Sequence, residues 1–146
     1  MSSNGSIEIV TNGFRLSSKQ QFFDEMKVNG WKFETNNEVV YLLDNEDDLF
    51  NWIHEDKSNV NEIIKRVVHN LELGKDVGIS MSFKDSEFGW LVLIENDFKT
   101  FNFCLEVGRK LLGNTDITDF SWHLAHIVPT LLLSGFSIEG IDCDWG

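Results

Sequence analysis

Positions 76–107 read DVGISMSFKDSEFGWLVLIENDFKTFNFCLEV, and this stretch contains three strand-like segments separated by short polar connections. Residues 76–84 and 99–107 alternate apolar and polar side chains, as half-buried strands do. Residues 88–96 are apolar on both faces, which is typical of a strand at the centre of a sheet. The connections KDSE and END suit tight antiparallel turns. The stretch therefore predicts an antiparallel β-meander with residues 88–96 in the middle.

Further strands and helices are expected on both sides of this meander. Runs of β-branched, aromatic or alternating apolar residues predict strands at residues 6–10, 38–44 and 136–146. Capping residues and apolar periodicity predict helices at residues 18–30, 44–56, 59–74 and 118–135. The sum is an α+β fold with one domain over residues 1–146, mainly an antiparallel β-meander sheet packed by about four α-helices.

Several helix boundaries can be assigned from local chemistry. Ser18 with Gln21, and Asn59 with Glu62, have the spacing of helix-capping pairs. Pro129 removes a helical hydrogen bond and should kink or restart the last helix. One side of that helix is expected to be apolar and to face the core, through Ile117, Phe120, Leu124, Ile127, Val128 and Leu131.

The net charge of −12 is concentrated in two segments. Residues 33–56 contain eight acids, residues 111–146 contain five, and neither segment contains a Lys or Arg. A protein with this asymmetry should repel nucleic acid and anionic membranes and attract cationic partners. The first ten residues lack the pattern of a secretory signal, and apolar runs such as Leu91–Ile94 are too short to cross a bilayer. We therefore expect a cytoplasmic protein whose two cysteines are buried thiols.

The acidic segment at residues 44–56, DNEDDLFNWIHED, admits two structural interpretations. Four acids fall at positions 1, 3, 5 and 12 of a calcium-type loop, namely Asp44, Glu46, Asp48 and Glu55. Leu49 stands where such a loop needs glycine, which argues against calcium. A short helix is favoured, with Asp44 or Asn45 as its cap, Glu46, Asp47 and Asp48 in its first turn, and its apolar residues packed inward. Capping explains where these acids lie but not why there are so many.

Two other clusters could carry chemistry. Asp119, His123 and His126 share one helix face, and with Cys143 they could hold zinc; the alternative is a helix whose histidines bond to carbonyls or water. Asp142 and Asp144 share one strand face, where paired acids can catalyse or bind magnesium. More often such acids protect an edge strand from aggregation.

Known catalytic signatures are absent from the sequence, including phosphate loops, G-x-S-x-G, C-x-x-C and H-E-x-x-H. We therefore predict a non-enzymatic protein without cofactor or metal that inhibits a basic protein. Carboxylates would steer the partner, and indole rings beside them would anchor it. The predicted partner-binding residues are Asp44, Glu46, Asp47, Asp48, Trp52, Glu55, Asp56, Asp142, Asp144 and Trp145.

In size, acidity and the succession GISMSF, GWLVLIE, TFNFCLEV and DFSWHLAHIVPTLLLSGFSIEGIDCDW, the chain resembles bacterial toxin-immunity proteins. The resemblance covers about the last seventy residues and is to the CdiI-type partners of contact-dependent growth inhibition toxins. It implies cytoplasmic neutralisation of one cognate toxin domain, an RNase or DNase. Two alternatives stay open: a nucleic-acid mimic or adaptor that binds a host protein, and a small metal-dependent enzyme.

Overall fold

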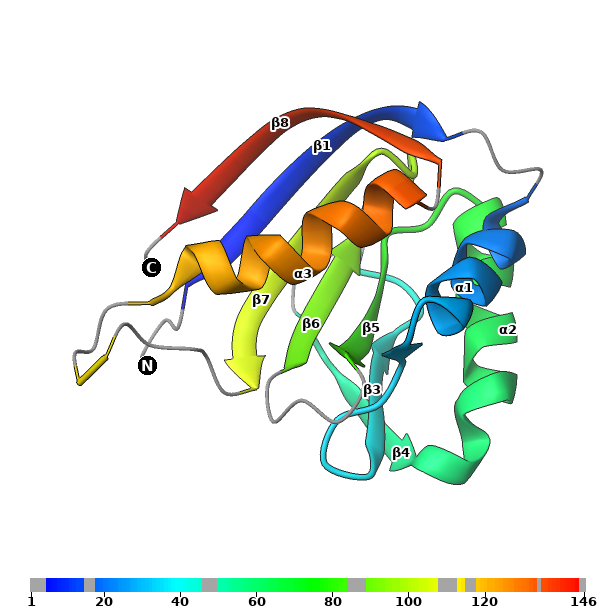
Figure 1. Ribbon diagram of the computed structural model, residues 1–146. Coiled ribbons are helices and arrows are strands. Elements are labelled where there is room, and N and C mark those ends of the chain that lie inside the picture. Colours follow the sequence, from blue (N-terminus) through cyan, green and yellow to red (C-terminus); the bar gives the residue numbers. More distant parts are fainter. Residues whose placement is uncertain are drawn as a thin grey trace.

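The computed structural model describes residues 5–14, 18–45, 50–83, 89–107, 113–114, 118–133 and 135–144 of the chain. Figure 1 shows its elements in the order β1 (Ser6–Phe14), α1 (Lys19–Val28), β2 (Trp31–Lys32), β3 (Glu38–Leu42), β4 (Ile53–Asp56), the 3₁₀ helix η1 (Lys57–Asn59), α2 (Val60–Glu72), β5 (Val77–Phe83), β6 (Gly89–Ile94), β7 (Thr100–Val107), α3 (Phe120–Leu133) and β8 (Phe136–Asp144).

The strands form one antiparallel sheet in the order β4-β3-β5-β6-β7-β1-β8, and β2 pairs with β5 beyond the end of β3. The predicted meander is confirmed as β5–β6–β7, with the doubly apolar segment as the central strand β6. β1 is longer than predicted and lies between β7 and β8, so the first and last strands are neighbours. The α+β class is confirmed.

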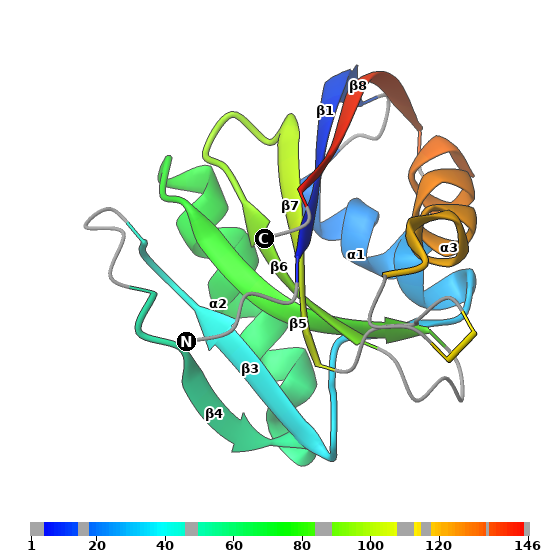
Figure 2. The same ribbon diagram turned by 90° about the vertical axis from the view of Figure 1, so that its left-hand side faces the viewer.

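Alternate strand residues divide between two faces of this sheet. The face that we call inner is covered by α1, α2 and α3 and carries a core rich in aromatic rings, including Phe22, Phe101, Phe103 and Trp90. The opposite face, which we call the outer face, has α1 and α2 behind it in Figure 2. The strand residues on this outer face are those that alternate with the core residues, and they form the candidate site.

The predicted helix over residues 44–56 is wrong where the structure describes it. Ile53–Asp56 is strand β4, which pairs with β3 from Tyr41↔Ile53 to Glu38↔Asp56. The described residues therefore contain three α-helices rather than about four. The physical reason is that β3 offers an unpaired edge, and pairing with it outweighs the weak helix propensity of Trp, Ile and His.

The caps agree with the sequence only in part. The Ser18 hydroxyl accepts a hydrogen bond from the Gln21 amide at 3.2 Å, which confirms the cap of α1. Asn59 makes no such bond at the start of α2. Asp56 instead caps the preceding η1 by accepting from the Ser58 amide at 2.9 Å, so the chain enters α2 through a 3₁₀ turn.

The face that α3 buries overlaps the predicted apolar side at Ile127 and Leu131 but also includes His123 and Thr130. The buried residues are His123, Ile127, Thr130 and Leu131, whereas Leu124 and Val128 are only half-buried. α3 continues through Pro129 as one helix, so the predicted restart does not occur. Pro129 and Ala125 both lie on the exposed side, where water can satisfy the carbonyl that the proline leaves without a donor. In the part of the chain that the structure describes, no helix combines the length and apolar character that a bilayer-spanning segment requires.

Candidate partner-binding surface

One row of opposed residues crosses six strands on the outer face and changes from apolar to acidic. In the order of the strands β3, β5, β6, β7, β1 and β8 it consists of Leu42, Gly78, Leu93, Asn102, Glu8 and Asp142. Residues opposed in this way place their side chains next to one another. The apolar half lies near the segment between β3 and β4, and the acidic half lies at the β8 edge.

Trp52, from the segment between β3 and β4, lies over the apolar half of this row. A Cβ atom at position 78 would lie 2.7 Å from Cη2 and 2.8 Å from Cζ3 of Trp52, so only glycine leaves room for the ring. The indole is half-buried. Trp52 is therefore neither a core residue nor a fully projecting one, because one part of its ring packs on the sheet and the rest stays exposed.

Phe50 stands beside Trp52 in an unfavourable backbone conformation. Its φ angle of 52° is left-handed, a region that bulky residues rarely adopt, and its residue surface is 46% exposed. Two hydrogen bonds hold it, one from the Phe50 amide to Asn45 Oδ1 at 3.2 Å and one from the Trp52 amide to the Phe50 carbonyl at 2.9 Å. The backbone thus holds a large apolar ring at the surface.

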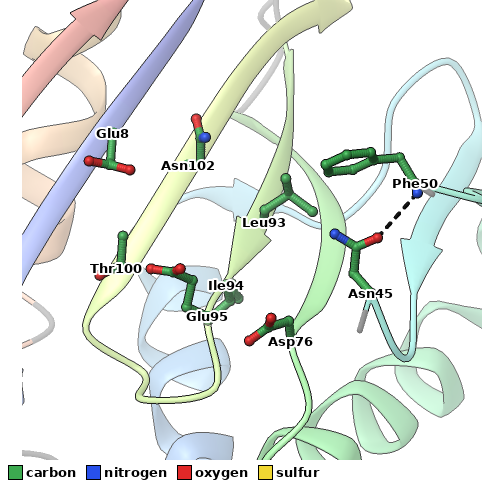
Figure 3. A pocket seen from close by; sticks show the side chains of 9 residues that line it. All are labelled: Glu8, Asn45, Phe50, Asp76, Leu93, Ile94, Glu95, Thr100 and Asn102. Atoms are coloured by element: carbon green, nitrogen blue, oxygen red, sulfur yellow. Dashed lines mark hydrogen bonds between the residues drawn. The ribbon is translucent and has the colours of Figure 1, made fainter. Parts of the chain in front are cut away.

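Three adjoining hollows lie around these two rings. The central hollow, of about 470 Å³, is lined by Ser6, Phe50, Trp52, Leu91, Leu93, Asn102 and Cys104. The acidic hollow, of about 120 Å³, shares Phe50, Leu93 and Asn102 with it and adds Glu8, Asn45, Asp76, Ile94, Glu95 and Thr100. Figure 3 shows the Phe50 ring reaching toward Leu93 and Asn102. We call these two hollows together the outer-face groove.

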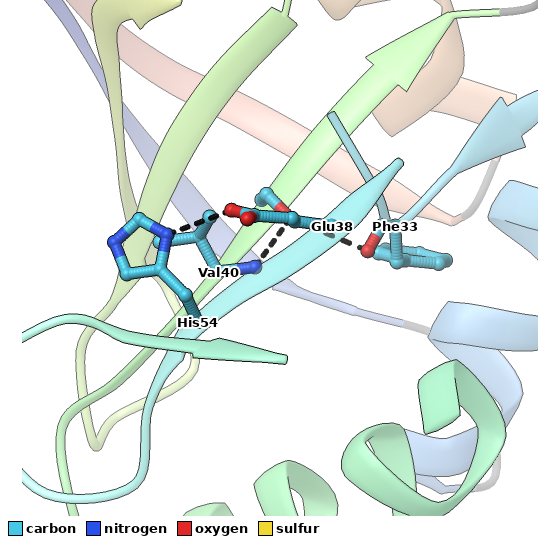
Figure 4. A network of polar contacts seen from close by, with 5 residues as sticks. Phe33, Glu38, Val40 and His54 are labelled. Carbon is cyan, nitrogen blue, oxygen red and sulfur yellow. Dashed lines mark hydrogen bonds and ion pairs between the residues drawn. The ribbon is translucent and has the colours of Figure 1, made fainter. Parts of the chain in front are cut away.

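The third hollow, of about 270 Å³, shares Trp52 and Leu91 with the central hollow and includes Glu38 and His54. His54 Nδ1 lies 2.9 Å from Glu38 Oε2 (Figure 4). Nearby, the Ser80 hydroxyl accepts a hydrogen bond from the Val40 amide at 3.1 Å and donates one to the Phe33 carbonyl at 3.3 Å. Ser80 thereby joins β5 to β3 just beyond their backbone pairing.

Asn102 has an unusual role in the groove wall. Its Oδ1 atom is covered, yet no donor among the described residues reaches it. Buried polar atoms are almost always hydrogen-bonded, because an unpaired one loses water without gaining a partner. This side chain therefore costs stability where it stands.

The predicted acids at the C-terminal end lie on the outer face. Asp142 is directly opposite Glu8 and Asp144 is opposite Ser6, and both aspartates are exposed. Among the described residues, no Lys or Arg forms an ion pair with Glu8 or Asp142. Like charges directly opposite each other destabilise a sheet, so a positive charge beside this pair would relieve the repulsion.

Those acids of the first segment that the structure describes have separate partners. Glu55 points to the helix side, where it accepts hydrogen bonds from the Tyr41 hydroxyl, from Asn59 and, at 3.2 Å, from Arg66. The Tyr41 hydrogen bond lowers the pKa of Glu55, and burial raises the pKa of Tyr41. Glu55 therefore stabilises the β3–α2 contact and does not share a face with Trp52.

The remaining predicted residues of this surface have varied positions. Asp44 forms an ion pair with Lys75 at 3.3 Å, and Asp56 caps η1. Residues 33–56 contain no Lys or Arg, but folding brings Lys75 to Asp44 and Arg66 to Glu55. Glu46, Asp47, Asp48 and Trp145 lie outside the described residues.

The zinc alternative is contradicted in the described part of the chain, where no group of three metal-ligating side chains comes together. His123 is fully buried and its Nδ1 accepts a hydrogen bond from the Trp90 indole at 3.1 Å. Burial lowers the pKa of His123 to about 4, so its ring is neutral at physiological pH. His126 Nδ1 donates to the Trp122 carbonyl at 2.8 Å. The calcium alternative depends partly on residues outside the described ranges.

The cysteine prediction is wrong for Cys143, which is exposed on β8, while Cys104 is half-buried in the central hollow. Sequence reasoning also missed Glu8 on β1 and Asn102 on β7, which both line the groove. One signal was available, because the doubly apolar segment 88–96 requires something to cover its second face. That signal predicts a covered outer face without saying which polar residues border it.

Comparison of the sequence with protein-family models and with curated proteins found no match, and comparison of the structure with solved structures found none.

Proposed function

We propose that this protein is a stoichiometric inhibitor of a cationic protein domain, namely an immunity protein that neutralises a nuclease toxin in the cytoplasm. The observation that carries the proposal is the opposition of Glu8 and Asp142 on the same sheet face that holds Trp52 and Phe50. A cationic partner would relieve the repulsion between the two carboxylates and cover the two exposed rings.

Charge and aromatic surface have different effects in such a complex. Carboxylates on one face speed the encounter with a positive partner and orient it, and this effect weakens as salt is added. The lifetime of the complex depends on well-packed, desolvated contacts, for which Trp is the most effective side chain. The outer face places both kinds of residue together, with Trp52 and Phe50 near its middle and the paired acids at its β8 edge.

A nuclease toxin is the favoured partner class because nuclease clefts are positive where they bind phosphates. A face of carboxylates can occupy such a cleft in place of the phosphates. The low symmetry of the face, apolar at one end and acidic at the other, would fix the orientation of the partner. The proposed role is binding and blocking, with no reaction performed by the inhibitor.

The test is to co-express the protein with the product of the neighbouring gene and to measure rescue of growth and co-purification. The paired substitution Glu8→Lys with Asp142→Lys should lower the association rate by about tenfold at low salt, because both changes reverse charge on the binding face. Surface binding measurements at several salt concentrations would give this rate.

The matched control is Asp24→Lys with Glu72→Lys, which changes the net charge equally at exposed positions on α1 and α2. Equal loss of rate in the two double variants would mean that net charge alone matters, and would contradict a role for the outer face. Co-purification of a host nucleic-acid-binding protein without any toxin would instead support the adaptor alternative.

A further inference from the structure

The outer-face groove is apolar at one end and rich in oxygen acceptors at the other. The central hollow has Trp52, Leu91 and Leu93 in its walls, whereas the acidic hollow has Glu8 and two further carboxylates. A side chain that crosses from the first hollow to the second would bury an aliphatic stem before its end reached the acceptors. That arrangement suits a long cationic side chain.

Asn102 stands where the two hollows meet. It is opposed to Leu93 on β6 and to Glu8 on β1, so the amide and the carboxylate are neighbours across adjacent strands. Asn102 Oδ1 has no donor among the described residues. Leucine would fill a similar volume without an unpaired polar atom, so the asparagine has a cost that the fold by itself does not explain.

We propose that the groove receives an arginine side chain from the cationic partner. The aliphatic stem would lie against Trp52 and Leu93, and the guanidinium would donate hydrogen bonds to Asn102 Oδ1 and to the Glu8 carboxylate. This inference rests on the proposed function and names the chemistry of one contact within it.

Arginine fits better than lysine for two reasons. Its planar group carries five N–H donors in a fixed fork, which can reach two acceptors on neighbouring strands at once. The same plane can stack on an aromatic ring, and Phe50 and Trp52 both line the central hollow. A lysine ammonium is a compact charge. It does not span two acceptors on neighbouring strands, and it has no planar group to stack on the rings.

The occupant reaches Oδ1 through a small movement. The terminal torsion of an asparagine side chain has a broad energy profile, so the amide of Asn102 can turn its oxygen toward the hollow. Side-chain rotations of this kind are common when interfaces form. Occupancy then supplies the donor that Asn102 Oδ1 lacks among the described residues.

The probe for this site is the peptide acetyl-Gly-Arg-Gly-amide, compared with the same peptide in which citrulline replaces arginine. Citrulline has almost the same shape but no charge. Titration of the full-length protein, followed by nitrogen–proton correlation spectra, should shift the Asn102 side-chain amide and the Trp52 indole signals. We expect the arginine peptide to bind at least about tenfold more tightly. Equal binding of both peptides, or shifts confined to other residues, would overturn the proposal.

Two variants at Asn102 test the acceptor directly. Asn102→Leu should lower the affinity for the arginine peptide by about tenfold. Asn61→Leu, at an exposed position on α2, should leave that affinity unchanged. Asn102→Asp keeps the shape and strengthens the acceptor, so it should tighten binding and make it more sensitive to salt. If Asn102→Leu does not fold, an unchanged affinity in Asn102→Asp is enough to reject the proposal.

Failure of this inference can be told apart from failure of the proposed function. Retained co-purification of the toxin together with no binding of the arginine peptide would reject only the arginine site. Specific binding of the arginine peptide without a complex between the two gene products would reject the toxin partner and keep the site.

Discussion

His123 and Asn102 show how the surroundings of a residue decide its role. On a helix face, a histidine beside an aspartate and a second histidine resembles a metal ligand, but His123 is an acceptor inside the core, bonded to Trp90. Asn102 lies on a strand whose alternation predicts only that it faces away from the core. Asn102 is a candidate binding residue because it lies between Glu8 and Leu93 on the neighbouring strands.

The burial of His123 predicts a loss of stability in acid. Burial lowers its pKa from 6.5 to about 4, an effect that Asp119 opposes and His126 reinforces. The folded protein therefore holds this ring neutral, and the unfolded chain binds the additional proton. The neutral ring's contribution to the free energy of unfolding is complete above pH 6.5 and is lost as the pH falls from there through 4. The free energy of unfolding should therefore decrease by roughly 3 kcal/mol between pH 7 and pH 4.

Urea unfolding at several pH values measures this effect. His123→Asn keeps an acceptor near Nδ1 but does not titrate, so its free energy of unfolding should fall less steeply over the same pH range. Carboxylates that titrate in this range affect both proteins alike. Identical pH profiles for the two proteins would show that His123 does not contribute.

At the scale of elements, strands were predicted where their own residues alternate or are β-branched, and β4 was missed because its residues carry no such pattern. β5, β6 and β7 follow one another with short turns, so alternation alone places them. β4 has no such pattern, and it is a strand because β3 lies beside it. Helix α3 docks through indole hydrogen bonds as well as apolar contacts, so its apolar periodicity identified Ile127 and Leu131 but not the buried His123 and Thr130.

The docking of α3 can be tested at Thr130. Its hydroxyl accepts from the Trp31 indole at 2.7 Å and donates to the His126 carbonyl at 3.1 Å, in a buried position. Thr130→Val keeps the shape and leaves the indole N–H without an acceptor. We expect a loss of about 1–3 kcal/mol in the free energy of unfolding.

A double-mutant cycle with Trp31→Phe provides the control. In that background no indole N–H remains to be satisfied, so Thr130→Val should cost less than about 1 kcal/mol. Equal costs in both backgrounds would show that the hydrogen bond between α3 and β2 does not hold the helix in place.

At the scale of the whole molecule, one sheet separates two different environments. Its inner face packs against the helices and forms the core, while its outer face holds a groove, two partly exposed rings and opposed carboxylates. The net charge of −12 acts on folding and bears on the proposed binding. Negative charges repel one another in the compact state and attract a cationic partner.

Added salt should therefore have opposite effects on folding and on binding. Raising sodium chloride from 0.01 M to 0.5 M shortens the screening length from about 30 Å to under 8 Å. The midpoint of thermal unfolding should rise by several degrees, because screening reduces self-repulsion. The association rate with the partner should fall over the same range. A midpoint that falls with salt would show that the native ion pairs outweigh the repulsion.

The amino-acid sequence by itself determined the meander, its central strand, helices α1 and α2 and the acidic character of the protein, because these depend on periodicity, caps and composition over short distances. Only the tertiary structure decided which residues share the outer face. Glu8 and Asp142 come from opposite ends of the chain, and Trp52 reaches Gly78 from another segment. Such neighbours are set by strand pairing between distant segments, which no local pattern contains.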